Sequence, residues 1–416
     1  MTYPVAFCFD SHVPGIGMDA WAHVWIFWWF KKAIVDLRSN PFQTNYVFHP
    51  EGGGLIINTP SIALLSVALQ LFVSPPLAYN IMWFSSFVLG GYGMFLVVSY
   101  LTKDKSAAFV SGAIFAFSPY HFAHALGHSE NFLQWIPFLV LYLIRTKDER
   151  NSANPILAAI FMFLASTSSW YYMLHLSVLL GFFLLFYAFD PASKKLDWDL
   201  LKRLALMSAV FLALFTSIAI AAASALAQSS SISETIALWP DLVSFLLPGG
   251  LHPILRQYLQ ELRYIVYSRS EGDTFLGFTA LILSAYAVAR GRGRDRIFWT
   301  LIALVGAIFA LGPYLRVGGV DTAVPLPFGI LANVLQMVPF GSWFRAPGRF
   351  VILTVVALSI LAGMGIARIS TRTSLLNLKR RQLRSTIQGA ALICLLFEFW
   401  ATPYPVSYTH LTLPTK

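Results

Sequence analysis

The sequence predicts an all-α polytopic membrane protein with about ten transmembrane helices. Three observations support this class: 57% of the residues are hydrophobic, 12% are charged, and apolar stretches recur throughout the 416-residue chain. Several stretches approach the roughly 20 apolar residues that a helix needs to cross the hydrocarbon layer. The two cysteines, Cys8 and Cys394, are too few for a disulfide framework.

Ten segments are predicted to span the membrane: residues 77–101, 107–126, 132–146, 154–169, 172–189, 202–226, 275–290, 297–315, 350–368 and 386–402. Two further apolar segments, Thr59–Val73 and Phe328–Phe340, would break the alternation of inward and outward loops if they crossed. We expect both to be short interfacial or re-entrant helices. Two prolines, Pro75 and Pro76, end the first of them.

Most of the 29 basic residues lie in short loops that follow every second predicted span. Such loops face the cytoplasm, so we assign the remaining loops to the outer surface. The formal charge of +10 therefore reports topology, and no nucleic-acid partner is expected. The basic loop residues are Lys103 and Lys105; Arg145, Lys147 and Arg150; Lys194, Lys195, Lys202 and Arg203; Arg290, Arg292, Arg294 and Arg296; and Arg368, Arg372, Lys379, Arg380, Arg381 and Arg384.

This topology divides the chain into three parts. Residues 1–76 form a first outward loop with interfacial helices, and residues 77–406 form the bundle, with outward loops at 119–131, 227–274 and 316–349. An outward N-terminus with no signal peptide implies a missing span before Thr2. The last ten residues, 407–416, resemble translated adapter sequence and are expected to be a non-native tail. We therefore expect truncation at both ends.

The first outward loop holds a helix with two distinct flanks. A step of 100° per residue places Asp19 and His23 one turn apart on one flank, away from a tryptophan stripe that we expect at the headgroup layer. Asp19 has two interpretations. Either it caps the helix and His23 serves as a hydrogen-bond partner of its carboxylate, or it belongs to a site built with the rest of the chain. The tryptophans are Trp21, Trp25, Trp28 and Trp29.

The second outward loop contains His121, His124 and His128 at a spacing that shares one helical face, followed by Glu130. Histidines at this spacing can bind a metal with a carboxylate, or they can hydrogen-bond loop carbonyls. We expect His128 and Glu130 to line the same outer cavity as Asp19.

Two later outward loops add charged candidates. Glu271 and Asp273 stand just before a predicted span, where an acid is either a solvated end residue or part of a cavity. Arg345 and Arg349 lie four residues apart around Pro347. Their guanidinium groups suit bidentate contact with a phosphate, which is either that of a substrate or that of an ordinary headgroup.

Several motifs in a fixed order resemble a known superfamily. They are MDAWAHVWIFWWF, NPFQTNYVFHPEG, FSPYHFAHALGHSEN, LLPGGLHP, EGDTFLGF, and ALGPYL through FRAPGRF. In this order they resemble bacterial and archaeal membrane proteins of the GT-C fold. That superfamily contains multi-spanning glycosyltransferases that use polyprenyl-phosphate-linked sugars, such as protein mannosyltransferases and oligosaccharyltransferases. The resemblance covers nearly all of residues 3–404.

The resemblance implies roles for these residues. Asp19 matches the catalytic acid of the first outward loop, and Glu130 occupies the region of a second, metal-assisting acid. Apart from the resemblance, Glu271 is a further catalytic candidate because of its place before a predicted span. The substrate-binding candidates are His23, His128, Arg345 and Arg349. Metal-using relatives can carry a DxD-like pair in the first loop, which is absent around Asp19. The metal is therefore unknown; magnesium and manganese are the candidates.

The resemblance implies transfer of a sugar from a polyprenyl-phosphate donor to an unknown glycan, lipid or protein acceptor. The reaction is expected at the outer face of a bacterial or archaeal plasma membrane. The alternatives are a polytopic transporter and a lipid-handling scaffold without catalysis. Transporters usually place charges at mid-membrane and contain internal repeats, and we find neither feature in the sequence.

Overall fold

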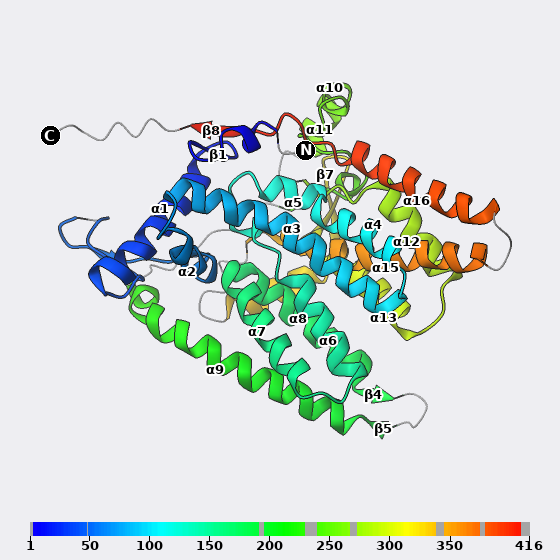
Figure 1. The fold of residues 1–416 in the computed structure, drawn as a ribbon, viewed down its shortest axis with the longest axis horizontal. Coiled ribbons are helices and arrows are strands. Elements are labelled where there is room, and N and C mark those ends of the chain that lie inside the picture. Colours follow the sequence, from blue (N-terminus) through cyan, green and yellow to red (C-terminus); the bar gives the residue numbers. More distant parts are fainter. Residues whose placement is uncertain are drawn as a thin grey trace.

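The computed structural model describes residues 3–47, 49–190, 195–228, 239–266, 273–337, 345–374 and 379–408. Helices dominate the architecture, and the strands form two-stranded antiparallel ribbons at its edges (Figure 1). The ribbons are β1 (His12–Pro14) with β8 (Val406–Tyr408), β2 (Gln43–Thr44) with β3 (Gly53–Gly54), β4 (Phe189–Asp190) with β5 (Lys195–Leu196), and β6 (Tyr314–Val317) with β7 (Val320–Pro325). The predicted tail therefore begins inside β8, and residues 409–416 lie outside the described chain.

Each predicted span overlaps a helix of the bundle. These helices are α3 (Pro75–Thr102), α4 (Lys105–Ala116), α6 (Ile136–Asp148), α7 (Ala153–Ser168), α8 (Trp170–Tyr187), α9 (Trp198–Gln228), α12 (Phe278–Arg290), α13 (Arg294–Ala310), α15 (Val351–Ser374) and α16 (Lys379–Glu398). The central helix is α15, which packs against α3, α4, α12, α13 and α16. The apolar stretch Pro347–Ile369 covers most of α15, and 94% of the residues in its most apolar part are buried within the protein. In the stretch Trp198–Ala223 of α9 this share is 11%, so its apolar side chains point outward.

Four described helices are long and apolar enough to cross a membrane: Pro75–Thr102, Trp170–Tyr187, Trp198–Ala223 and Pro347–Ile369. The predicted count of ten spans is therefore not confirmed. One predicted span, residues 107–126, is not a single helix, because α4 ends at Ala116 and a short α5 (Pro119–His124) follows. Pro119 cannot continue the α4 hydrogen-bond ladder, and the Ser118 side chain instead accepts a hydrogen bond from the His121 N–H at 3.3 Å.

The predicted outward loops contain short helices. They are α1 (Met18–Lys31), its π-helical continuation η2 (Lys32–Leu37), α2 (Pro60–Leu69), α10 (Leu255–Tyr258), α11 (Gln260–Val266), α14 (Phe328–Gln336), and the 3₁₀ turns η1 (Val5–Phe7), η3 (Ser129–Asn131), η4 (Leu242–Phe245) and η6 (Pro347–Phe350). At 10 and 9 residues, α2 and α14 are too short to span a bilayer, as expected of the two segments that would disturb the topology. The end of the second segment, from residue 338, lies outside the described chain.

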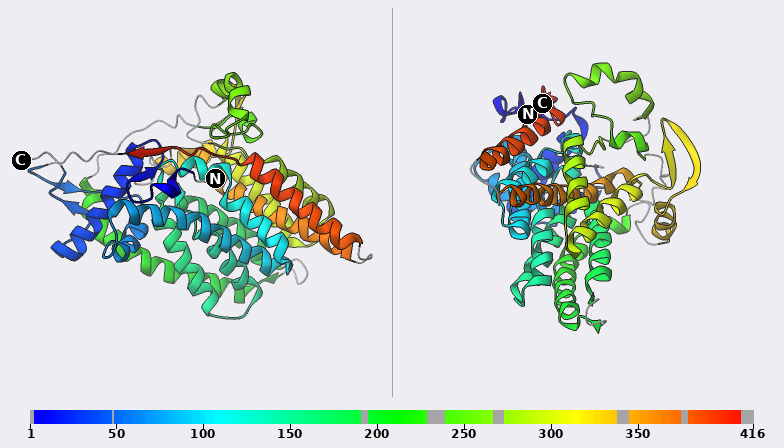
Figure 2. Two further views of the ribbon diagram at one scale, coloured as in Figure 1. Left: turned by 45° about the horizontal axis from the view of Figure 1, so that its top comes forward. Right: turned by 90° about the vertical axis from the view of Figure 1, so that its right-hand side faces the viewer.

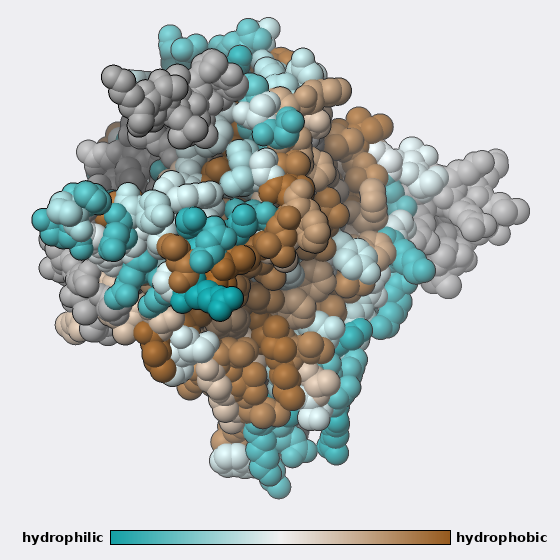
Figure 3. All heavy atoms as spheres, turned by 60° about the vertical axis from the view of Figure 1, so that its left-hand side comes forward, coloured by the Kyte–Doolittle hydropathy of each residue, from teal (hydrophilic) through white to brown (hydrophobic). Residues whose placement is uncertain are grey.

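The basic loops all lie at one end of the bundle, and α1 and α2 lie near the other (Figure 1). Contacts join these loops to one another: Lys147 Nζ is 2.8 Å from Asp295 Oδ1, and Arg203 Nη1 donates to the Glu149 carbonyl at 2.8 Å. Figures 2 and 3 show the elongated bundle and a broad hydrophobic surface with hydrophilic residues around its margins. The bundle therefore has two polar ends separated by an apolar middle.

Candidate active site

Asp19 lies in the first turn of α1 and does not cap it. The helix begins at Met18 after Gly17, a residue with φ of 125°, and no side chain makes a capping hydrogen bond there. The interpretation of Asp19 as a helix cap is therefore wrong. Its side chain is 64% exposed. Asp19 is thus accessible to a molecule in the surrounding solvent.

The second outward loop packs directly on this helix terminus. Gly127 has φ of +137°, and a Cβ atom at this position would lie 3.0 Å from the Ala20 nitrogen. On the other side, Gly15 approaches the Leu126 carbonyl too closely to permit any side chain. This close backbone approach requires glycine at both positions. It brings His128 Nδ1 to 3.7 Å from Asp19 Oδ2, so the structure joins the first two outward loops at this point.

His23 lies behind Asp19 in an aromatic environment. Its ring is 6% exposed and lies between Tyr79 and Phe132, with ring centroids 6.4 and 6.3 Å away. Burial lowers the pKa of His23 to about 4, against the opposing charges of Asp19 and Glu130. Within the described residues, Nδ1 has no hydrogen-bond partner. His23 is therefore neutral at pH 7 and supports the site from the interior.

Glu130 and Arg349 form a buried ion pair that links the second outward loop to the start of α15. Glu130 Oε1 lies 2.7 Å from Arg349 Nη1, and the two side chains are 1% and 9% exposed. Ser169 Oγ donates to the same carboxylate oxygen at 2.9 Å. Burial, the largest single influence, would raise the pKa of Glu130, but the charges of Arg349, His124 and His128 together outweigh it and the pKa falls to about 2. Glu130 is therefore ionised, paired and withdrawn from the surface.

The histidines of α5 bond to carbonyls, and the ring centroid of His124 lies 5.7 Å from that of His128. His121 Nδ1 lies 2.8 Å from the Ala116 carbonyl, and its Nε2 lies 3.1 Å from the Asn131 carbonyl. His124 Nδ1 lies 2.8 Å from the Tyr120 carbonyl. These contacts favour the carbonyl-bonding interpretation over a three-histidine metal site. No set of three or more ligand side chains is close enough to hold a metal ion within the described residues.

The divalent metal, magnesium or manganese, stays a prediction. Among the described residues, Asp19 and His128 supply two donor groups at this site, and the Glu130 carboxylate is committed to Arg349. We therefore derive no step through a metal. Glu271 lies outside the described residues, and its carboxylate cannot be added to this set.

The two arginines of the last outward loop occupy different environments. Arg349 is buried, and its guanidinium carbon lies 3.9 Å from the centroid of the Tyr171 ring. Arg345 is partly exposed and precedes η6. They therefore do not form the exposed pair of guanidinium groups that the spacing suggests.

Sequence reasoning missed the residues that complete the ion pair. Ser169 bonds to Glu130, Tyr172 donates its hydroxyl to the Glu130 carbonyl, and Tyr171 covers Arg349. The stretch STSSWYY, at the predicted outer end of a span, was the available signal. It was also wrong to place the whole tryptophan stripe in the headgroup layer, because Trp29 is 2% exposed and donates to the Pro41 carbonyl.

A family model covers most of the chain. It matches residues 10–380 and is described as a domain of unknown function, DUF6311. The chain belongs to this family. No curated protein matches the chain.

Solved structures show the fold of this DUF6311 member. The apo oligosaccharyltransferase of Archaeoglobus fulgidus has a TM-score of 0.57 at 12% identity, covering 99% of this chain and 54% of its own. Mycobacterial arabinofuranosyltransferase AftD has a TM-score of 0.55 at 12% identity, covering 94% of this chain and 26% of its own. ArnT from Cupriavidus metallidurans has a TM-score of 0.51 at 14% identity, covering 94% of this chain and 69% of its own.

These structures are GT-C glycosyltransferases, so the expected GT-C fold is confirmed. The chain spans about half the length of the archaeal oligosaccharyltransferase and about a quarter of the length of AftD. A further oligosaccharyltransferase structure, of AglB from A. fulgidus, contains an inhibitory peptide and a dolichol-phosphate, at 12% identity and a TM-score of 0.53. The fold and the apolar helices together identify this chain as a membrane protein.

Proposed function

We propose that this protein transfers a sugar from a polyprenyl-phosphate donor to an acceptor hydroxyl at the outer face of the membrane. The observation that carries the proposal is the exposed Asp19 carboxylate of a GT-C-fold chain, at the end of the bundle opposite the basic loops. Glycosyl transfer is the activity named for the oligosaccharyltransferase and for AftD. The dolichol-phosphate bound to AglB supports a lipid-linked donor.

In the proposed reaction, the acceptor hydroxyl attacks the anomeric carbon as the bond from that carbon to the phosphate oxygen breaks. The bonding electrons leave with the polyprenyl phosphate, and Asp19 takes the hydroxyl proton as general base. A single displacement of this kind inverts the anomeric carbon. His128, 3.7 Å from Asp19, restricts the orientation of the carboxylate.

The environments of the two acids lead us to revise the role of Glu130. A general base must reach the substrate and accept a proton, and a buried carboxylate held by Arg349 and Ser169 is poorly placed for both. We assign Glu130 as a positioning residue that fixes Arg349 and with it the start of α15. Arg345, four residues earlier and partly exposed, is then the better candidate for the leaving phosphate.

A transfer assay tests this proposal. A full-length parent protein is reconstituted into vesicles with a labelled polyprenyl-phosphate hexose, and membranes of the source organism supply the acceptors. We expect the label to leave the lipid and appear on an acceptor. The variant Arg345→Ala should lower transfer about tenfold or more. Arg345→Lys should recover part of the transfer because lysine keeps the charge, and only part because lysine lacks the planar guanidinium group.

The matched control is Arg256→Ala, which removes an exposed arginine from another outward loop and should leave transfer unchanged. No transfer above that of protein-free vesicles would contradict the proposed function. Movement of the intact labelled lipid across the bilayer would favour the transporter instead. Full activity of Arg345→Ala would assign this arginine to ordinary headgroups.

A further inference from the structure

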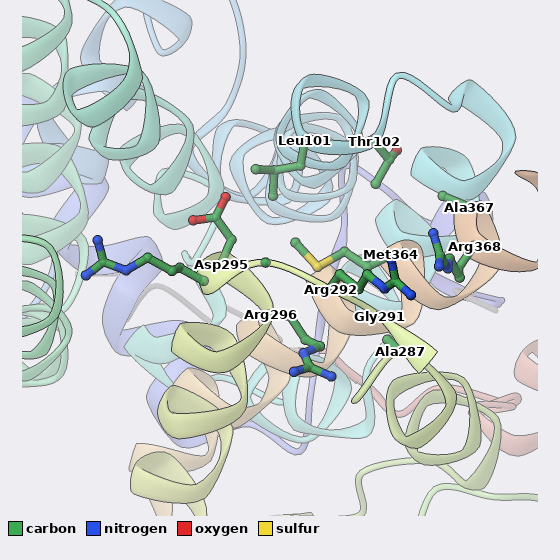
Figure 4. A pocket seen from close by; sticks show the side chains of 12 residues that line it. Leu101, Thr102, Ala287, Gly291, Arg292, Asp295, Arg296, Met364, Ala367 and Arg368 are labelled. Carbon is green, nitrogen blue, oxygen red and sulfur yellow. The ribbon is translucent and has the colours of Figure 1, made fainter. Parts of the chain in front are cut away.

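A second polar feature lies at the basic end of the bundle, away from Asp19. It is a pocket of about 620 Å³ between the end of α3, the α12–α13 turn and α15 (Figure 4). One part of its wall is apolar and includes Leu101 and Met364. The other part carries the guanidinium groups of Arg292, Arg296 and Arg368, with Arg294 also in the lining.

The lining residues of the pocket carry a net positive charge, with four arginines and one acid. Its single acid, Asp295, already accepts hydrogen bonds from Lys147 Nζ at 2.8 Å and from the Tyr187 hydroxyl at 2.6 Å. Arg294 and Arg296 bond to main-chain carbonyls, which orient the guanidinium groups without neutralising them. An anion is therefore the ligand class that the charges favour.

The surroundings of the pocket favour a lipid over a free anion. Exposed apolar residues follow Arg296 along one stripe of α13, at positions Ile297, Leu301, Leu304 and Ile308. A headgroup held by the arginines can thus continue into acyl chains lying along this stripe. The position agrees with the inner headgroup layer, because the basic loops at this end are those that the positive-inside rule assigns to the cytoplasm.

We infer that this pocket binds the phosphate of an anionic glycerophospholipid of the inner leaflet, with guanidinium groups on the phosphate and acyl chains along α13. The site is separate from the proposed donor site, so it does not depend on glycosyl transfer. A lipid bound there would anchor the meeting point of α3, α12, α13 and α15 in the membrane.

The test measures lipid retention by the full-length parent protein. The protein is released from nanodiscs containing phosphatidylglycerol and phosphatidylcholine, and the bound lipids are counted by native mass spectrometry. We expect retention of phosphatidylglycerol over phosphatidylcholine. The variant Arg292→Gln/Arg368→Gln should weaken this retention about tenfold or more, since it removes two charge-assisted bonds.

The matched control, Arg150→Gln/Lys202→Gln, removes two charges from the same end of the bundle and none from the pocket lining. It should retain phosphatidylglycerol like the parent. Equal loss in both double variants would mean general surface attraction and would overturn the proposal. So would equal retention of the two lipids, or displacement of phosphatidylglycerol by millimolar inorganic phosphate.

A second measurement uses only the parent protein, so its result does not depend on whether the variants fold. A photoreactive phosphatidylglycerol, with its probe on the headgroup, is crosslinked to the parent protein. Mass spectrometry should place the crosslinks within residues 287–296 or 364–368. Crosslinks spread over the other basic loops would contradict the site.

Discussion

The two polar ends of the bundle stabilise their charges in opposite ways. At the Asp19 end, two loops meet through glycine contacts and a buried ion pair, Glu130 with Arg349. At the basic end, the most exposed pair is Arg150 with Asp199, 3.7 Å apart with side chains 88% and 60% exposed, and the side chains of Arg145 and Glu149 are 36% and 39% exposed. Exposed pairs contribute about 1 kcal/mol or less, whereas breaking a buried pair costs about 3–5 kcal/mol. The Asp19 end therefore fixes the relative positions of its side chains, whereas the basic end exposes charged side chains to the solvent.

The largest expected difference between the ends is their accessibility from outside the cell. In a full-length parent whose Cys8 and Cys394 are replaced by alanine, an impermeant thiol reagent should label Glu51→Cys in intact cells. It should label Arg150→Cys only after the membrane is opened, because the positive-inside rule places that loop in the cytoplasm. The reverse pattern would invert the topology and remove the basis for an outer active site.

The next largest effect is expected at the buried ion pair. Glu130→Gln leaves the Arg349 charge buried without its counter-ion and should lower the free energy of unfolding by about 3–5 kcal/mol. Glu149→Gln is the matched control, since its carboxylate lies 3.9 Å from Arg145 at the basic end and is 39% exposed. It should cost about 1 kcal/mol or less. Denaturant titration in mixed micelles measures both, and equal losses would contradict the contrast between the ends.

A smaller effect concerns the pH dependence of stability at the Asp19 end. His23 is neutral in the folded protein down to pH of about 4, while an unfolded histidine binds a proton below about pH 6.5. Its contribution is therefore complete above pH 6.5 and is lost as the pH falls toward 4. Between pH 7.5 and 5.0, the loss in the parent should exceed that in His23→Gln by about 2 kcal/mol.

The control for this experiment is His49→Gln, because His49 is exposed and lies in the same outward loop. Its stability should change with pH as that of the parent does. The measurement is denaturant titration in mixed micelles at the two pH values. Identical pH dependence of the parent and His23→Gln would remove His23 from the buried support of the site.

The sequence predicts local features of this fold well, because they depend on neighbouring residues. Apolar runs located helices at each predicted span, and the two prolines after Val73 marked the end of a short segment. The break at Ser118–Pro119 was also readable, but hydropathy alone carried the predicted span across it. The count of ten spans is not confirmed, because helix length and burial also depend on tertiary packing, which hydropathy does not report.

The site was less predictable, because its contacts join residues far apart in the chain. Glu130 and Arg349 are 219 residues apart, and nothing in their spacing indicates an ion pair. Helical periodicity placed His121, His124 and His128 on one helical face. In the structure α5 ends at His124 and the backbone turns at Gly127, but the ring centroids of His124 and His128 are still 5.7 Å apart. Asp19 was found by its isolation from other acids, and His128, which the sequence also assigned to its surroundings, lies 3.7 Å away, whereas Glu130 is paired with Arg349.

The rate of sugar transfer by Asp19→Asn tests the central claim most directly. Asparagine keeps the shape of the side chain but cannot take the proton, and Asp19 makes no capping bond whose loss would destabilise α1. In the full-length parent, this variant should fold, bind the lipid donor and lose a factor of about 100 to 10,000 in rate. Asp10→Asn, which changes another exposed acid of the same loop, should keep the parental rate. Transfer by Asp19→Asn within a few-fold of the parent would contradict the assignment of Asp19 as the base.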